Sequence, residues 1–242
     1  MKLKRYYYQS ELNINQTIAL EGDEFHHLKN VMRTNIGDKV ILFNNSNFDA
    51  IGKVISINKN KAEISIEEII QNTNEPTIEV TLFQAVCKGD KLSLITQKIT
   101  ELGCSNMVVF YSQFTDIKDK TSKLDKLEKV SISASKQCGR SSILSVKGVM
   151  DFESMLLEAQ KLDKVFVAYE NADQTSLFDS LQQNSKYKKV GIIIGAEGGF
   201  SDKEIDIINK YNFEIVTLGK RILRTETASI VSVAQIMFAC EK

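Results

Sequence analysis

Two patterns of hydrophobic positions divide the chain. In residues 1–72, short apolar runs alternate with turns rich in Asn and Lys, which is typical of antiparallel hairpins. A helix is predicted at Glu21–Val31, because Asp23 can cap it and apolar residues recur at helical spacing. The predicted strands are Val40–Phe43, Ala50–Ile57 and Ala62–Ile66. This first segment is therefore predicted to form a small β-barrel domain.

The pattern changes after a polar stretch, residues 71–77, that contains the only proline of the chain, and we expect a linker there. Beyond it, apolar strands alternate with amphipathic helices over residues 73–242. The strands are expected at Glu79–Val86, Met107–Tyr111, Lys164–Tyr169, Val190–Ile194 and Glu214–Leu218, and the helices at Lys91–Leu102, Thr121–Gln137, Gln174–Gln182, Asp202–Lys210 and Thr225–Cys240. Such alternation predicts an α/β domain whose parallel sheet carries helices on both faces and binds ligands beyond the carboxyl ends of its strands.

Composition narrows the class of protein. Lys and Arg together number 31, as do Asp and Glu, so no global positive field indicates nucleic-acid binding. The four cysteines form no CxxC pair and the only histidines are the adjacent His26 and His27, which predicts no metal site and a reducing compartment. No run of 18 apolar residues occurs, and the N-terminus has no apolar core of a signal peptide. We expect a cytoplasmic protein without a membrane segment.

Local charge is uneven. Between Lys118 and Arg140 there are seven basic residues and three acidic ones. One interpretation is a solvated helix face with ion pairs between successive turns, and the other is a surface that contacts phosphates. The pattern alone favours neither.

Gly195-Ala196-Glu197-Gly198-Gly199-Phe200 directly follows the predicted strand Val190–Ile194. Three glycines in five positions permit a tight turn and close approach of a ligand to the backbone. Ser201 and Glu204 have the spacing of a capping box, which predicts where the next helix begins. The turn lacks the spacing of a dinucleotide or nucleoside triphosphate motif, so a phosphate cradle is not supported. Glu197 is then a carboxylate held among glycines at the predicted crevice.

A second turn, from Leu218 to Ala228, leads from a strand into the apolar C-terminal helix. Arg224 and Glu226 have two interpretations: an ion pair at the start of the helix, or a site for an anionic partner beside the glycine turn. Their position at the crevice favours the second.

Four segments together resemble a known family: IGAEGGFSDKE, LGKRILRTETA, QKITELG and HHLKNVMR. In this order they are similar to the ribosomal small-subunit RNA methyltransferase E family, whose members methylate N3 of one uridine in 16S ribosomal RNA. The likeness covers nearly the whole chain. It implies S-adenosylmethionine as cofactor, an N-terminal PUA-like RNA-binding barrel at 1–72, and a C-terminal SPOUT domain with a trefoil knot at 73–242.

The resemblance also assigns residues. It implies that Gly195, Glu197, Gly198, Gly199, Leu218, Gly219, Ile222, Leu223 and Arg224 bind the cofactor. Uridine N3 carries a proton at neutral pH, so a base must remove it, which contributes on the order of 10²–10⁴-fold. We expect Glu226 or Glu197 to be that base and Arg224 to stabilise the resulting anion. Candidate RNA contacts are Arg5, Tyr7, His26, Arg33, Lys88, Lys136 and Arg140.

Partners follow from the same resemblance: 16S ribosomal RNA within the small ribosomal subunit, and a second copy of the chain bound through the knotted domain. The C-terminal helix is expected at that interface, although its apolar residues fit an internal core equally well. The chain departs from the family at Ala196, where proline is usual, at Lys136, where an acid is usual, and at Ser112–Thr115, where an arginine is usual.

Two other functions remain. One is a non-catalytic RNA-binding protein that retains the SPOUT fold. The other is a nicotinamide-dependent oxidoreductase, which the missing dinucleotide motif disfavours.

Overall fold

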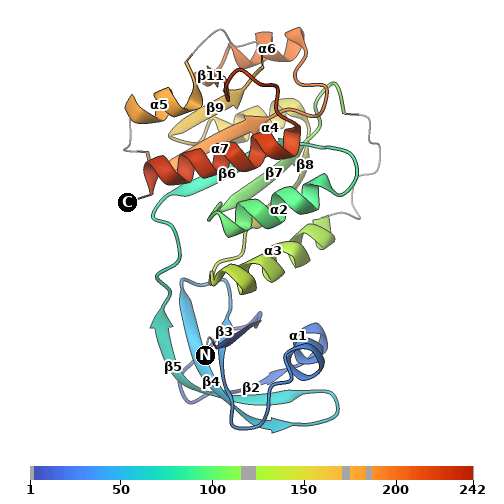
Figure 1. Ribbon diagram of the computed structural model, residues 1–242, viewed down its shortest axis with the longest axis vertical. Coiled ribbons are helices and arrows are strands. Elements are labelled where there is room, and N and C mark those ends of the chain that lie inside the picture. The colour runs from blue at the N-terminus through green and yellow to red at the C-terminus, as the bar shows by residue number, and fades with distance from the viewer. Residues whose placement is uncertain (1–2, 116–123, 171–174, 184–186, 242) are drawn as a thin grey trace. The chain divides into compact units, whose positions relative to one another are not determined.

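The computed structural model describes residues 3–115, 124–170, 175–183 and 187–241. The chain forms two compact units (Figure 1). One comprises residues 1–75 together with 135–143, and the other comprises residues 76–134 and 144–242. The segment 135–143 therefore packs with the first unit although it lies far along the chain.

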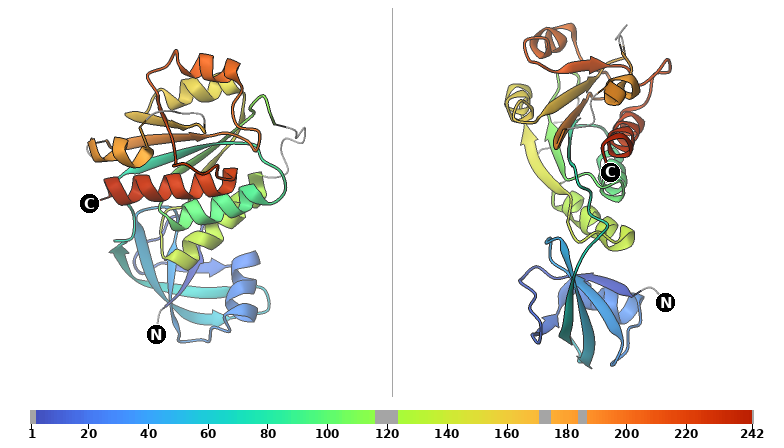
Figure 2. Two further views of the ribbon diagram at one scale, coloured as in Figure 1. Left: turned by 45° about the horizontal axis from the view of Figure 1, so that its top comes forward. Right: turned by 90° about the vertical axis from the view of Figure 1, so that its left-hand side faces the viewer.

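The first unit is one curled sheet with the strand order β1-β3-β4-β5-β2 (Figure 2). Its strands are β1 (Lys4–Tyr7), β2 (Thr17–Leu20), β3 (Lys39–Phe43), β4 (Phe48–Ile57) and β5 (Ala62–Gln71). The predicted hairpins are confirmed, because β3, β4 and β5 pair antiparallel in sequence order. The predicted early helix is also present, as α1 (Gly22–His26) continued by a π-helical turn, η1 (His27–Val31).

A buried ionic network is centred on Arg5 in β1. This charged residue interrupts the apolar pattern by which strands were predicted, so β1 was not predicted. Arg5, in the middle of this strand, donates two hydrogen bonds of 2.7 Å to Asp49 and one of 2.9 Å to the carbonyl oxygen of Arg140. Glu75 accepts hydrogen bonds of 2.7 Å from the backbone amides of Ser141 and Ser142. A buried charge is tolerated only with partners, and here they come from segments distant in sequence. The same network holds 135–143 in the first unit.

The second unit is built on a parallel sheet with the strand order β11-β9-β10-β6-β7-β8. Its strands are β6 (Glu79–Ala85), β7 (Asn106–Phe110), β8 (Ser145–Met150), β9 (Lys164–Ala168), β10 (Lys189–Ile194) and β11 (Glu214–Val216). Its helices are α2 (Lys91–Glu101), α3 (Leu124–Cys138), α4 (Phe152–Ala159), α5 (Leu177–Gln183), α6 (Asp202–Ile208) and α7 (Thr225–Cys240). The predicted alternation is confirmed. We did not predict β8 or α4. The edge strand β8 carries few large apolar residues, so the apolar pattern did not indicate a strand there.

Hydrophobic cores lie on both faces of this sheet (Figure 2). Along β6, Leu82 belongs to the core under α2, α5 and α7, whereas Phe83 belongs to the core under α4 and α6. Successive strand residues point to opposite faces, so a strand that is apolar throughout serves both cores.

The order of the strands locates a binding crevice. From β6 the chain moves outward to β7 and β8, and then returns to the other side, where β10 lies between β9 and β6. Ligands bind where the strand order reverses, beyond the carboxyl ends of the strands. The segments that leave β6 and β10 therefore border the expected site. In the part of the chain that the structure describes, no helix combines the length and apolar character needed to span a membrane.

Candidate active site

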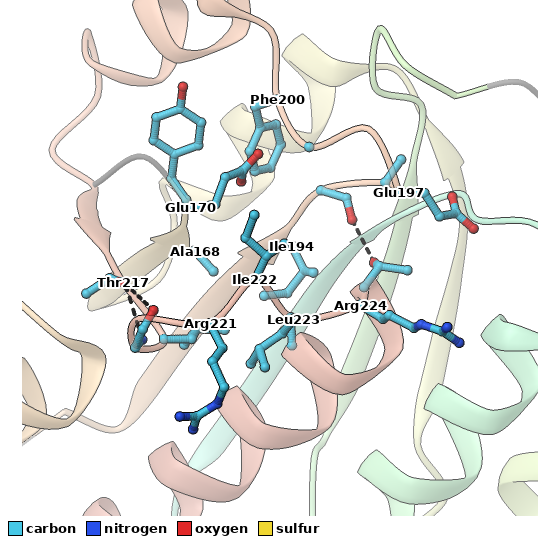
Figure 3. Close-up of a pocket in the computed structure, with 18 of the residues that line it drawn as sticks. Ala168, Glu170, Ile194, Glu197, Phe200, Thr217, Arg221, Ile222, Leu223 and Arg224 are labelled. Atoms are coloured by element: carbon cyan, nitrogen blue, oxygen red, sulfur yellow. Dashed lines mark hydrogen bonds between the residues drawn. The ribbon is translucent and has the colours of Figure 1, made fainter. Parts of the chain in front are cut away.

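A cavity of about 390 Å³ opens beyond the carboxyl ends of β9, β10 and β11 (Figure 3). Its lining comes from residues 168–170, 194–197, 199–200 and 217–225, with Lys91 and Ala228. The two turns singled out from the sequence thus adjoin and enclose one space. Of the residues expected to bind a cofactor, all line this cavity except Gly198, which lies on the outer side of the glycine turn against Phe114.

The glycine turn is tight because Gly199 has a φ of 69°, a conformation that side chains disfavour. Its amide donates a 3.0 Å hydrogen bond to the carbonyl oxygen of Ala196. A Cβ at Gly199 would lie 2.5 Å from Oε1 of Glu170, so glycine also leaves room for this carboxylate at the cavity wall. The predicted capping box of Ser201 and Glu204 is confirmed at the start of α6.

Thr225, the first residue of α7, joins the two turns. Its hydroxyl donates a 2.7 Å hydrogen bond to the carbonyl oxygen of Gly195 (Figure 3). Gln84 Nε2 donates a 3.0 Å hydrogen bond to Thr225 Oγ1. Gln84 is fully buried in β6 and accepts a further hydrogen bond from Ser229. We did not identify Gln84 from the sequence. Its polar side chain within an otherwise largely apolar strand could have indicated a buried hydrogen-bonding role.

Lys91, at the start of α2, lies between the two candidate carboxylates. Its Nζ is 2.8 Å from Glu197 Oε1 and 3.5 Å from Glu226 Oε2. The backbone amide of Lys88 also donates a 3.0 Å hydrogen bond to Glu197 Oε1. Burial acts to raise the pKa of Glu197, but the hydrogen bonds from Lys91 and Lys88 outweigh it and lower that pKa. The hydrogen bond to Glu197 raises the pKa of Lys91. We did not single out Lys91 from the sequence.

Glu226 and Arg224 have different surroundings. The Oε2 atom of Glu226 is inaccessible to solvent and accepts no hydrogen bond from the described residues. Arg224 is exposed, and its guanidinium forms no ion pair or hydrogen bond with the residues that the structure describes. The two side chains therefore do not form the helix-start ion pair that was one interpretation of the sequence. In Figure 3, Arg224 and Glu197 extend toward the same side of the cavity.

Family models match both units: an RNA methyltransferase domain matches residues 73–237, and an RNA methyltransferase PUA domain matches residues 20–67. Ribosomal RNA small subunit methyltransferase E of Bacillus subtilis is 32% identical over 233 residues, which cover 93% of this chain and 91% of the relative. The chain belongs to the ribosomal RNA small subunit methyltransferase E family. The resemblance inferred from the sequence motifs is thereby confirmed.

Solved structures agree with membership in the methyltransferase E family. A methyltransferase from Legionella pneumophila, in complex with S-adenosylmethionine, is 26% identical and has a TM-score of 0.91, with 100% of both chains covered. The methyltransferase E from Neisseria gonorrhoeae, also bound to S-adenosylmethionine, is 26% identical with a TM-score of 0.89, covering 99% of this chain and 98% of that one. Both structures contain the cofactor that the motifs imply.

The structure separates the residues that we expected to contact RNA into buried and exposed ones. Arg5 and Arg140 are buried in ion pairs with Asp49 and Glu75, which gives both side chains a structural role. Lys136 pairs with Glu24 at 2.7 Å. His26, Arg33 and Lys88 are exposed and Tyr7 is half-buried. The first part of the basic stretch, Lys118–Lys123, lies outside the described residues. No group of His, Cys, Asp and Glu among the described side chains is arranged to hold a metal ion.

Proposed function

We propose that this protein transfers the methyl group of S-adenosylmethionine to N3 of one uridine in 16S ribosomal RNA of the small ribosomal subunit. The observation that carries the proposal is the single cavity enclosed by the glycine turn and the Leu218–Thr225 segment, with Glu197, Lys91 and Glu226 at its border. Family membership supplies the reaction class, and the cavity supplies a site for the cofactor.

The residues present fit this cofactor. A cavity of about 390 Å³ lies within the usual range of roughly 300–1,000 Å³ for small-molecule sites. Ile194, Leu218 and Leu223 give apolar walls for an adenine ring, and Glu170 gives an acceptor for hydroxyl or ammonium groups. When bound, the cofactor supplies a methyl group on a sulfonium, which a nucleophile attacks in line.

The chain must then remove the proton from N3. Glu197 already accepts two hydrogen bonds, from Lys91 and from the Lys88 amide, and its lowered pKa makes it a weak base. Glu226 lies farther from the Lys91 ammonium, at 3.5 Å against 2.8 Å for Glu197, so Lys91 holds its carboxylate less strongly and we assign the base to Glu226. Arg224, exposed on the same side of the cavity as Glu197, stabilises the negative charge that develops on the uracil ring.

We extend the proposal to both domains. Residues 73–242 form a SPOUT domain with a trefoil knot, supported by the return of the chain from the edge strand β11 to α7, which packs on the central strands β10 and β6. Residues 1–72 form a PUA-like barrel that binds RNA, supported by the family match at residues 20–67 and by the curled sheet. Exposed candidates for RNA contact are His26, Arg33 and Lys88.

A homodimer through the second unit is part of the proposal. Phe238 on α7 is 88% exposed, and Ile222 in the turn before it is 87% exposed. A second copy that covers these two side chains would remove their apolar surface from water. Light scattering after size exclusion measures the mass in solution, and F238E is expected to shift a dimer toward the monomer.

Mass mapping of 16S ribosomal RNA tests the function. RNA from cells that lack this gene is expected to miss one methyl group on a uracil, and purified protein with S-adenosylmethionine should restore it on small subunits from those cells. An unchanged methylation pattern would contradict the proposal. Calorimetric titration with S-adenosylmethionine separates the enzyme from a non-catalytic RNA-binding protein of the same fold, which would release no binding heat.

A further inference from the structure

Phe114 is an exposed aromatic residue beside the glycine turn. It lies in the short turn Ser112–Thr115 that follows β7, and 48% of its surface is exposed. A Cβ built on Gly198 would lie 2.9 Å from Cβ and 3.2 Å from Cγ of Phe114. Glycine at 198 therefore lets Phe114 lie directly against the outer side of the turn.

The Ser112–Thr115 turn is fastened to the start of α6. Ser201 Oγ donates a 2.7 Å hydrogen bond to Gln113 Oε1, and the Gln113 amide donates a 2.9 Å hydrogen bond to Glu204 Oε1. Within the turn, the Ser112 amide donates a 3.1 Å hydrogen bond to Thr115 Oγ1. These bonds fix the turn that carries Phe114. The ring is therefore presented from a defined position on the surface.

The position of the ring separates it from the cofactor cavity. Glu197 and Gly199 line that cavity, whereas Gly198 between them faces Phe114 on the outside. If the cavity holds the cofactor, the second substrate must approach from outside, where Glu197 and Arg224 extend (Figure 3). Phe114 is an exposed aromatic ring against Gly198, the residue next to Glu197, and such a ring has the chemistry to receive a flipped nucleobase.

We propose that Phe114 is the platform on which the target uracil stacks when it leaves the RNA helix. The proposal rests on the proposed function and adds a substrate-binding residue to it. Pyrimidine rings stack on aromatic faces without hydrogen-bond readout, so Phe114 contributes affinity and orientation, while the groups at the cavity border act on N3. The competing explanation is that Phe114 only covers the glycine turn.

Four variants distinguish these explanations. F114A and F114L both remove the aromatic face, but F114L keeps an apolar side chain against Gly198. If stacking is the function, both raise KM for small subunits lacking the methyl group by about tenfold and leave the affinity for S-adenosylmethionine unchanged. F114W keeps KM near that of the wild type. F178A is the control, because Phe178 is 56% exposed on α5 and does not line the cavity.

Fluorescence gives a readout that does not require methyl transfer. The chain contains no tryptophan, so F114W introduces a single indole reporter. We expect its emission to be quenched when protein-free 16S ribosomal RNA binds, and the emission of F178W to stay unchanged. Wild-type KM in F114L, or unchanged F114W emission while a gel shift shows bound RNA, would overturn the proposal. Absence of methyl transfer by the wild type, with quenching intact, would instead count against the proposed reaction alone.

Discussion

Thr225 donates a 2.7 Å hydrogen bond to the carbonyl oxygen of Gly195, and this bond joins the first residue of α7 to the first residue of the glycine turn. Both groups are buried, and Gln84 completes the contact from the neighbouring strand. The shape of the cofactor cavity depends on this bond, because each turn forms one of its walls.

We expect T225V to weaken cofactor binding and to lower the free energy of unfolding by about 1–3 kcal/mol, because the buried Gly195 carbonyl loses its hydroxyl donor and Gln84 Nε2 loses one of its two acceptors. T225S keeps the hydroxyl and is the matched control. Calorimetry with S-adenosylmethionine and denaturant titration measure the two effects. Equal cofactor affinity of T225V and T225S would show that the bond does not shape the cavity.

We expect G199A to lose cofactor affinity, because a Cβ there would meet Glu170 Oε1 at 2.5 Å and the residue has a φ of 69°. G22A is the control, since Gly22 has a φ of 59° with no atom within 4 Å of the added Cβ. Both variants should lose roughly 1–2 kcal/mol of stability from the left-handed backbone. Only G199A should bind S-adenosylmethionine more weakly, and unchanged binding would contradict the assignment of this wall.

The hydrogen bond from Lys91 lowers the pKa of Glu197, so K91M is expected to raise that pKa toward its ordinary value. A carboxyl with a depressed pKa stabilises the fold above its unfolded pKa, and that stabilisation is lost as pH falls through the folded value. The free energies of unfolding of wild type and K91M should therefore become equal at acidic pH, below the pKa of Glu197 in the folded protein. Carbon-13 NMR of the Glu197 carboxyl measures the shift. K126M, which removes the exposed ion pair to Asp90, should leave the pKa of Glu197 unchanged.

R224A is expected to reduce the rate of methyl transfer by on the order of 10²–10³-fold without loss of stability, since Arg224 is exposed and stabilises developing charge. K126M is the control, because Lys126 is an exposed cation on α3 that does not line the cavity. Single-turnover rates with bound cofactor measure the effect. A normal rate in R224A would remove this residue from the mechanism.

R5A is expected to destabilise the first unit by about 3–5 kcal/mol, because it leaves Asp49 buried without its charged partner. R33A removes an exposed arginine and should weaken RNA binding while leaving the unfolding transition in place. Denaturant titration and RNA affinity at several salt concentrations separate the two roles. If R5A were stable but bound RNA more weakly, Arg5 would be an RNA contact rather than a structural residue.

Local pattern was sufficient for the elements whose stability is local. The hairpins β3–β5, the helix at Gly22–Val31 and the capping box at Ser201 follow from turn residues, apolar periodicity and capping chemistry within a few positions. Motifs at the two turns likewise indicated the family. The strands β1, β2 and β8 and the helix α4 were not predicted. Of these, β1 contains a buried arginine and β8 is a weakly apolar edge strand.

The sequence by itself determined the alternation of strands and helices, the two ligand turns and the family, because these are encoded in residues close together along the chain. The tertiary structure alone decided that Lys91 separates two carboxylates, that Gln84 and Thr225 fasten two turns, and that Arg5 is a buried partner of Asp49. Charge and hydrogen-bond interactions depend on which distant side chains come within a few ångströms. Folding brings these side chains together, and a local sequence pattern does not show how far apart they lie in the folded protein.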